Sequence, residues 1–187
     1  PPIRQRAAAV LKREIAHPGQ SSELVRLAAA ARKSQGAEPA LTRTGREANF
    51  FLYRSGNRCK VTIADDFFLV QAPGSKEPLE RLGAPQLLSE LEHAPEHFSP
   101  NVITRPVVQD AALPVLAMVA GPGERDYLSL LGEVYSFFAV EPSVVVPRPR
   151  ALLVEPRIEK RLARWRIARA SLEHEDWAEV QAAFLRQ

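Results

Sequence analysis

The chain has 187 residues, of which 45% are hydrophobic and 25% are charged, a balance typical of a globular domain with a substantial core. The formal net charge of +3 is too small to indicate a nucleic-acid partner, and no apolar run reaches the length of a membrane span. Cys59 is the single cysteine, which excludes an intrachain disulfide and a cysteine-based metal site. We therefore expect a cytoplasmic protein with no metal, nucleic acid or membrane as partner. The sequence begins at Pro1 without a methionine, which indicates part of a longer protein.

The first part of the chain predicts two helices followed by a small antiparallel sheet. Apolar residues recur at helical spacing in residues 3–16 and again in residues 22–35. Ser21 and Ser22 are the residues that would cap the second helix. Residues 47–71 are rich in aromatic and β-branched residues and contain two turn sequences, which indicates a three-stranded β-meander. We expect the two helices to cover this sheet.

A polar row follows the meander. Ser99 or Asn101 can cap a short helix over residues 102–111, and on that helix Asn101, Arg105 and Gln109 recur at every fourth residue and share one face. Arginine offers planar paired donors, and amides offer donors and acceptors, so the row suits a carboxylate or phosphate ligand. A solvated helix face explains the same residues equally well. Both interpretations stay open at this point.

The next segment predicts a parallel sheet. Residues 113–120 are almost all apolar, which is typical of a strand covered on both faces. Residues 124–138 have the apolar spacing of one helix, and residues 143–147 predict a second apolar strand. A strand, a helix and a strand in this order form a βαβ unit with parallel strands. The predicted fold class is therefore α/β.

Ligands of such sheets bind beyond the carboxyl ends of the strands. Two segments fall there: the turn that contains Gly121, Gly123 and Glu124, and Arg148 after the second strand. The N–H groups at a helix N-terminus suit an anion, and Arg148 would add a positive charge. A Gly-Pro-Gly turn is weak evidence by itself. The predicted anion site therefore depends on Arg148 reaching the same edge.

The last part of the chain differs from the rest. A basic helical segment is followed by a second helix that begins at Ser171 with acidic residues in its first turn, which indicates a helical or coiled-coil arm. We expect its basic residues to be solvated and not to bind nucleic acid. We therefore divide the chain into an α/β core portion, residues 1–155, and the start of a coiled-coil arm, residues 156–187.

Three blocks of sequence together resemble one known family. They are Phe98-Ser99-Pro100-Asn101-Val102 with Arg105-Pro106, Gln109-Asp110 and Leu113-Pro114; Ala120-Gly121-Pro122-Gly123-Glu124 with Tyr127; and Val146-Pro147-Arg148 with Glu155. In these blocks the chain resembles the bacillithiol biosynthesis cysteine-adding enzymes, which are cysteine ligases. The resemblance covers nearly the whole chain and implies a central to C-terminal fragment of such an enzyme.

The resemblance implies a fold and an activity. The fold would be a Rossmann-like parallel sheet, related to class I aminoacyl-tRNA synthetases, with the β-meander as an insert and a coiled-coil arm that forms a homodimer. The activity would be the joining of L-cysteine to glucosaminyl-malate through an amide bond, with ATP or ADP as the nucleotide. The residues of this chain that match the motifs, and that would bind substrate or another anion, are Asn101, Arg105, Gln109 and Arg148. Gly121, Gly123 and Glu124 would contact the cofactor, and no catalytic residue is assigned.

The chain also departs from the family pattern. Members of the family are much longer, and Ala120 stands where a second glycine is expected. We therefore expect the fragment to be inactive alone. The alternative function is a non-catalytic module that binds a nucleotide or another anion and assembles through its helical arm. A preceding glycine-rich half-fold in the longer protein would favour the ligase over the module.

Overall fold

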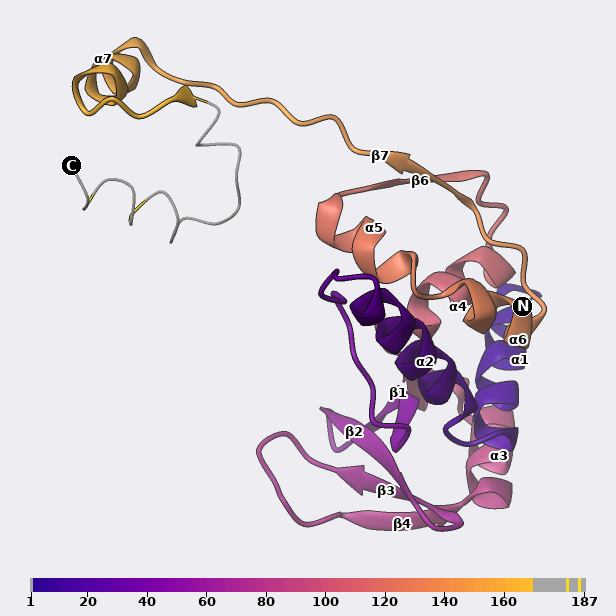
Figure 1. Ribbon diagram of the computed structural model, residues 1–187. Helices are drawn as coiled ribbons and strands as arrows, with labels where there is room; N and C mark the ends of the chain where they lie inside the picture. Colours follow the sequence, from indigo (N-terminus) through magenta and orange to yellow (C-terminus); the bar gives the residue numbers. More distant parts are fainter. Residues whose placement is uncertain (1, 170–180, 182–184, 186–187) are drawn as a thin grey trace. The chain divides into compact units, whose positions relative to one another are not determined.

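The computed structural model describes residues 2–169, 181 and 185 (Figure 1). Contacts divide the chain into two units, Pro1–Arg148 and Pro149–Gln187. The predicted helix from Ser171 onward lies outside the described residues, so the coiled-coil part of the predicted fold stays a prediction. None of the described helices is both long and apolar enough to cross a membrane.

Helices and strands are interspersed along the chain, which makes the fold mixed α/β. The helices are α1 (Pro2–Ala16), α2 (Gln20–Ser34), α3 (Ala84–His93), the 3₁₀ helix η1 (Pro95–His97), α4 (Thr104–Ala112), α5 (Pro122–Leu128), α6 (Gly132–Phe138) and α7 (Pro156–Arg164). The strands are β1 (Glu47–Arg54), β2 (Asn57–Ala64), β3 (Phe67–Gln71), β4 (Glu80–Gly83), β5 (Phe98–Pro100), β6 (Ala117–Ala120) and β7 (Val144–Pro147).

The larger sheet is antiparallel and has the strand order β4-β3-β2-β1-β5. The predicted meander over residues 47–71 is confirmed as β1, β2 and β3, joined by short turns. The sequence pattern missed the two outer strands. β4 lacks β-branched residues, and β5 is three residues long and ends in a proline, which suits an edge strand but gives little strand signal.

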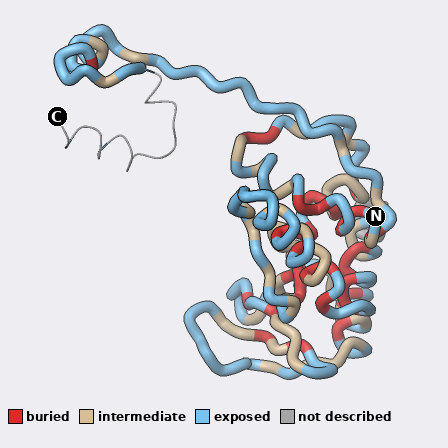
Figure 2. Tube along the Cα trace, in the orientation of Figure 1, coloured by how far each residue is buried: buried red, intermediate tan, exposed pale blue. Residues whose placement is uncertain are grey.

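The two strands predicted from the residues are parallel, as expected, but among the described residues β6 and β7 form a sheet by themselves, which is smaller than the Rossmann-like sheet that the resemblance implied. The expectation that these strands are covered on both faces is wrong for this structure. Val119 on β6 is 59% exposed and Val144 on β7 is 63% exposed, and Figure 2 shows β7 in the exposed colour. Helix α5 contacts β7, but the described residues do not cover both faces of this small sheet, whereas burial in a parallel sheet requires helices on both faces.

The helix predicted over residues 124–138 is two helices, α5 and α6. Leu130 and Leu131 close tight turns by donating their N–H groups to carbonyl oxygens three residues earlier, and α6 then begins at Gly132. Glycine is a poor interior helix residue, so a break costs little there. Both leucines are buried in the core, so the apolar faces of α5 and α6 remain continuous across the break.

Helix α1 packs in two hydrophobic clusters. Leu11 and Ile15 join the antiparallel sheet and α3, while Val10 joins α2, α4 and α6 through residues such as Val107 and Val134. Helix α1 therefore contacts the antiparallel sheet and α3 through one set of residues and the helices α2, α4 and α6 through another. The sheet and the helical part of the first unit are held together by this shared helix.

A buried polar network fixes the start of α2. Ser21 and Ser22 were expected to cap this helix, but its N-cap is Gly19, which has a φ of 78°. Both serines lie in the first turn, where Ser21 Oγ donates to Glu14 Oε1 at 2.9 Å and Ser22 Oγ donates to the Glu47 carbonyl at 2.9 Å. Their hydroxyl groups therefore join α2 to α1 and β1 and do not cap the helix.

Candidate functional site

The carboxyl ends of β6 and β7 bring two predicted site residues together. Ala120 pairs with Pro147 in the parallel register, and Arg148 N donates to the Ala120 carbonyl at 2.9 Å. The Arg148 guanidinium then lies over Gly121, with its Cζ 3.1 Å from the point that a Cβ on Gly121 would occupy. A Cβ on Gly121 would therefore force the guanidinium, which is the far end of a flexible side chain, to move away from the turn. The predicted parallel pairing of the two strands, which would bring Gly121 and Arg148 to the same edge, is thus confirmed.

The turn after β6 has a capping role. Gly121 N donates to Glu124 Oε2 at 3.0 Å, so the carboxylate of Glu124 already occupies the N-terminal end of α5. A Cβ on Gly123 would meet no atom within 4 Å, so the turn is open on that side. An ATP or ADP phosphate would fit the planar donors of Arg148 beside this open side. Of the described residues at this edge, Arg148 would be the one to hold such a phosphate, because Glu124 already occupies the end of α5.

Asn101 is the cap of α4. Its Oδ1 accepts hydrogen bonds from the N–H groups of Ile103 at 2.9 Å and Thr104 at 3.3 Å, and its Nδ2 donates to Asn49 Oδ1 at 2.9 Å. Of the two predicted caps, Asn101 is therefore the one used. Ser99 instead accepts a hydrogen bond from Arg58 at 3.1 Å. A ligand would have to displace internal bonds to use the Asn101 oxygen.

The rest of the predicted polar row is divided. Arg105 is exposed on α4, and its Nη2 donates to the Tyr127 hydroxyl on α5 at 3.0 Å. Asn101 and Arg105 line one cavity, whereas Gln109 is not among the residues that line it. The carbonyl of Gln109 accepts from Leu113 N and so ends the helix. Asn101 precedes α4, and of the predicted row only Asn101 and Arg105 line the same cavity.

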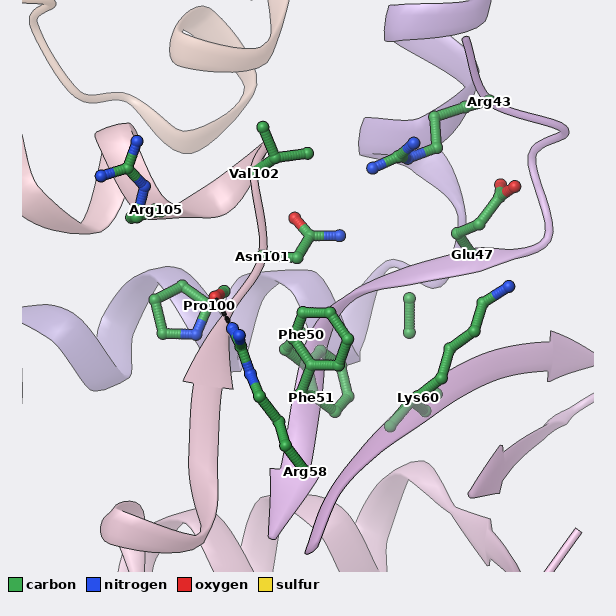
Figure 3. Close-up of a pocket in the computed structure, with 12 residues that line it drawn as sticks. Arg43, Glu47, Phe50, Phe51, Arg58, Lys60, Pro100, Asn101, Val102 and Arg105 are labelled. Atoms are coloured by element: carbon green, nitrogen blue, oxygen red, sulfur yellow. Dashed lines mark hydrogen bonds between the residues drawn. The ribbon is translucent and has the colours of Figure 1, made fainter. Parts of the chain in front are cut away.

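The cavity beside Asn101 and Arg105 has a volume of about 470 Å³ and is strongly basic (Figure 3). The sequence reasoning missed three of its cationic residues, Arg43, Arg58 and Lys60. A signal existed for two of them: Cys59 is buried in the core, so Arg58 and Lys60 on either side of it must point to the other face of β2.

Asp110 positions the loop that leads to β7. Its Oδ2 accepts hydrogen bonds from the Tyr135 hydroxyl at 2.8 Å and from Ser143 N at 3.0 Å. Burial and the neighbouring Asp110 carboxylate both raise the pKa of the Tyr135 hydroxyl, so it stays protonated and donates. Asp110 thereby connects α4 to α6 and to the start of β7, the strand that carries Arg148.

Comparisons with known proteins agree with the sequence blocks. Residues 1–149 match the family described as "Bacillithiol biosynthesis BshC, N-terminal Rossmann-like domain". A protein of Chlorobaculum tepidum named "Putative cysteine ligase BshC" is 37% identical over 160 residues, which are 84% of this chain and 27% of that protein. A protein of the same name from Carboxydothermus hydrogenoformans is 35% identical over 130 residues, which are 70% of this chain and 23% of the relative. The chain thus spans about a quarter of the length of these relatives.

Proposed function

This chain belongs to the BshC family of bacillithiol biosynthesis, and we propose that it is part of a ligase that joins L-cysteine to glucosaminyl-malate through an amide bond. The relatives are named as cysteine ligases, which supports the ligase class. The chain is a fragment of the active enzyme and is inactive alone. It acts in the cytoplasm, and the region from Pro156 onward pairs two copies as a homodimer.

The observation that carries the site assignment is the contact between Gly121 and the Arg148 guanidinium. Amide synthesis from a carboxylate needs a group that holds negative charge while two substrates are positioned. Arg148 supplies that group at the edge where α/β sheets bind their ligands. Bound ATP would supply the activation of the cysteine carboxylate. Asp110 keeps Arg148 in place through β7, and Arg105 is a second anion-binding residue.

Among the described residues, we assign no nucleophile to the proposed reaction. Cys59 is fully buried in the antiparallel sheet, and its Sγ lies 3.7 Å from the Asn57 carbonyl. A thiol enclosed in the core is out of reach of a substrate. The role of the described residues is therefore to bind and orient anionic groups.

The test uses the full-length protein that contains this chain. Cysteine, glucosaminyl-malate and ATP are supplied, and the amide product is measured by mass spectrometry. Arg148→Ala removes the guanidinium and leaves the Gly121 turn intact, and we expect product formation to fall by about 100-fold, the usual loss for one preorganised charge-stabilising donor. Arg125→Ala is the matched control, because this arginine is exposed on α5 and is not part of the Gly121–Arg148 contact.

Activity of Arg148→Ala equal to that of the wild type would remove Arg148 from the site. Failure of the wild-type protein to form product, together with saturable ATP binding that Arg148→Ala weakens, would favour the alternative function of a non-catalytic anion-binding module.

A further inference from the structure

The basic cavity is built from segments that are distant in sequence. Its walls come from β1, β2, the end of β5, the start of α4 and the loop before β1 (Figure 3). In the sheet register Phe51 lies opposite Lys60 on β2 and opposite Ser99 on β5, so the three strands form a continuous floor. Between Glu47 and Phe51 the pairing of β1 shifts, which bends the strand beside the cavity.

The charge of the cavity is unbalanced. Four cationic side chains line it: Arg43, Arg58, Lys60 and Arg105. Glu47 is the one carboxylate among these described lining residues, and both of its oxygens accept hydrogen bonds from Thr44 N while Oε1 also accepts from Thr44 Oγ1. That carboxylate is thus already engaged by its own loop. The cavity therefore presents an excess of positive charge.

Arg43 is the least solvated of these cations. Its Nε is buried and has no hydrogen-bond partner in the described part of the chain, while Nη1 donates to the neighbouring Thr42 carbonyl at 3.0 Å. Burial lowers the pKa of the Arg43 guanidinium, and Glu47 offsets this effect in part. A guanidinium remains charged in a protein, so an unpaired buried N–H of this group is costly. An anion in the cavity would remove that cost.

Two of the other cations are held in place before any ligand binds. The Arg58 guanidinium donates to Ser99 Oγ at 3.1 Å and to the Pro100 carbonyl at 3.0 Å, and its Cζ lies 4.0 Å from the centre of the Phe51 ring. Arg105 is held by Tyr127. Fixed donors lose little conformational entropy when an anion binds, so they favour binding.

Lys60 completes the set as a movable charge. It is exposed, its ammonium group has no partner in the part of the chain that the structure describes, and in Figure 3 it extends from β2 along the cavity. Three guanidinium groups and one ammonium group therefore surround a space large enough for a small organic anion.

We propose that this cavity binds a small dianion, whose two negative charges lie on one phosphate group or on two neighbouring carboxylates. A single negative charge would leave most of the cationic side chains unpaired, whereas two charges can meet both the fixed guanidinium groups and Lys60. The cavity shares Arg105 with the proposed ligase site, but Gly121 and Arg148 do not line it, so the inference goes beyond the Gly121–Arg148 contact and does not rest on it.

The experiment is calorimetric titration of the full-length protein at constant ionic strength with inorganic phosphate, succinate or acetate. We expect phosphate or succinate to bind at least tenfold more tightly than acetate. Each of the two charges of a dianion can form its own charge-assisted hydrogen bonds with the cationic side chains, whereas acetate has a single charge. A preference for phosphate identifies the phosphate class, and a preference for succinate identifies the dicarboxylate class. Saturable binding of neither dianion would overturn the proposal.

Two cavity variants and two controls locate the binding. Lys60→Met and Arg43→Met should each weaken dianion binding by about fivefold or more, while Lys76→Met, in an exposed loop, should leave it within about twofold. Lys60→Met removes no hydrogen bond within the described chain, so the variant should fold, and its thermal midpoint provides the check. Arg148→Ala removes the anion-binding group at the strand edge, and we expect it to weaken dianion binding less than either cavity variant does. Loss of binding in Arg148→Ala with wild-type affinity in both cavity variants would place the dianion at the strand edge and refute this proposal.

Discussion

Glu14 is 1% exposed on α1, and it is the most buried carboxyl group described in the chain. Its Oε1 accepts hydrogen bonds from Ser21 Oγ at 2.9 Å and Asn49 N at 3.0 Å, while Oε2 is buried and has no partner in the described residues. Burial raises the pKa of Glu14 above the ordinary value of 4.5, and the hydrogen bonds oppose this shift without cancelling it. The folded protein therefore holds a proton on Glu14 more tightly than the unfolded chain does.

The sign of the pH dependence follows from that raised pKa. The stability that protonated Glu14 contributes is fully present below the unfolded pKa near 4.5 and is lost as the pH rises through the higher folded pKa. Glu14→Gln keeps the oxygen acceptor and removes the ionisation. As the pH rises above about 4.5, we therefore expect Glu14→Gln to become more stable relative to the wild type, measured as the difference in their unfolding free energies.

Urea denaturation at a series of pH values measures this difference. Glu133→Gln is the matched control, because Glu133 is exposed on α6. Its difference from the wild type should show no comparable trend with pH. A Glu14→Gln difference that stays constant across the series would show that Glu14 has the same pKa in the folded and unfolded states.

Helix α4 depends on contacts that its own sequence does not contain. Its first turn is capped by Asn101, whose amide is in turn held by Asn49 on β1. Thr104 also donates its hydroxyl to the Asn49 carbonyl. The position of the helix that carries Arg105 is thus set by a strand more than fifty residues earlier in the chain. Cap and anchor are separate functions of one side chain.

Variants of Asn101 separate the cap from the anchor. Asn101→Ala should lower the unfolding free energy by about 1–3 kcal/mol, because it removes a helix cap and leaves Asn49 Oδ1 without its donor. Asn101→Asp retains the cap acceptor but loses the donor to Asn49, so we expect an intermediate loss. Gln109→Ala on the same helix should change stability by less than about 0.5 kcal/mol.

Thermal and urea denaturation of the three variants provide the measurement. Equal losses for Asn101→Ala and Gln109→Ala would contradict the capping role. Equal losses for Asn101→Ala and Asn101→Asp would assign the whole effect to the bond with Asn49.

At the scale of the molecule, the chain divides after Arg148 into two units. Residues 149–153 are exposed and lie outside any helix or strand. Protease cleavage is favoured where backbone is exposed and lacks regular hydrogen bonds. The boundary also follows directly after Arg148, so the segment begins where the proposed anion site ends.

Limited trypsin digestion of this chain should cut first after Arg150. The bond after Arg148 precedes Pro149 and resists trypsin, whereas the bond between Arg150 and Ala151 has no such protection. Mass spectrometry should therefore detect an early fragment that ends at Arg150, and Arg150→Gln should abolish it. Earlier cleavage within the antiparallel sheet, for example after Arg58, would show that the first unit is less stable than the boundary segment.

Much of the local structure follows from the sequence by itself. Helical spacing predicted α1 and α2, and alternation with turn residues predicted β1 to β3, because these signals lie within a few neighbouring residues. The meeting of Gly121 with Arg148 was also predictable, since two parallel strands end at the same edge. The sequence blocks further identified the family.

The tertiary structure decided what depends on distant contacts. Ser21 and Ser22 became part of a buried network because Glu14 and Asn49 lie beside them, and β7 stayed exposed because the described residues do not cover both faces of the small parallel sheet. Arg43 likewise joined the basic cavity through contacts between segments that are distant in sequence. No short stretch of sequence places it beside Lys60, because their separation is set by the pairing of β1 with β2, and pairing register is fixed by the packing of the whole sheet.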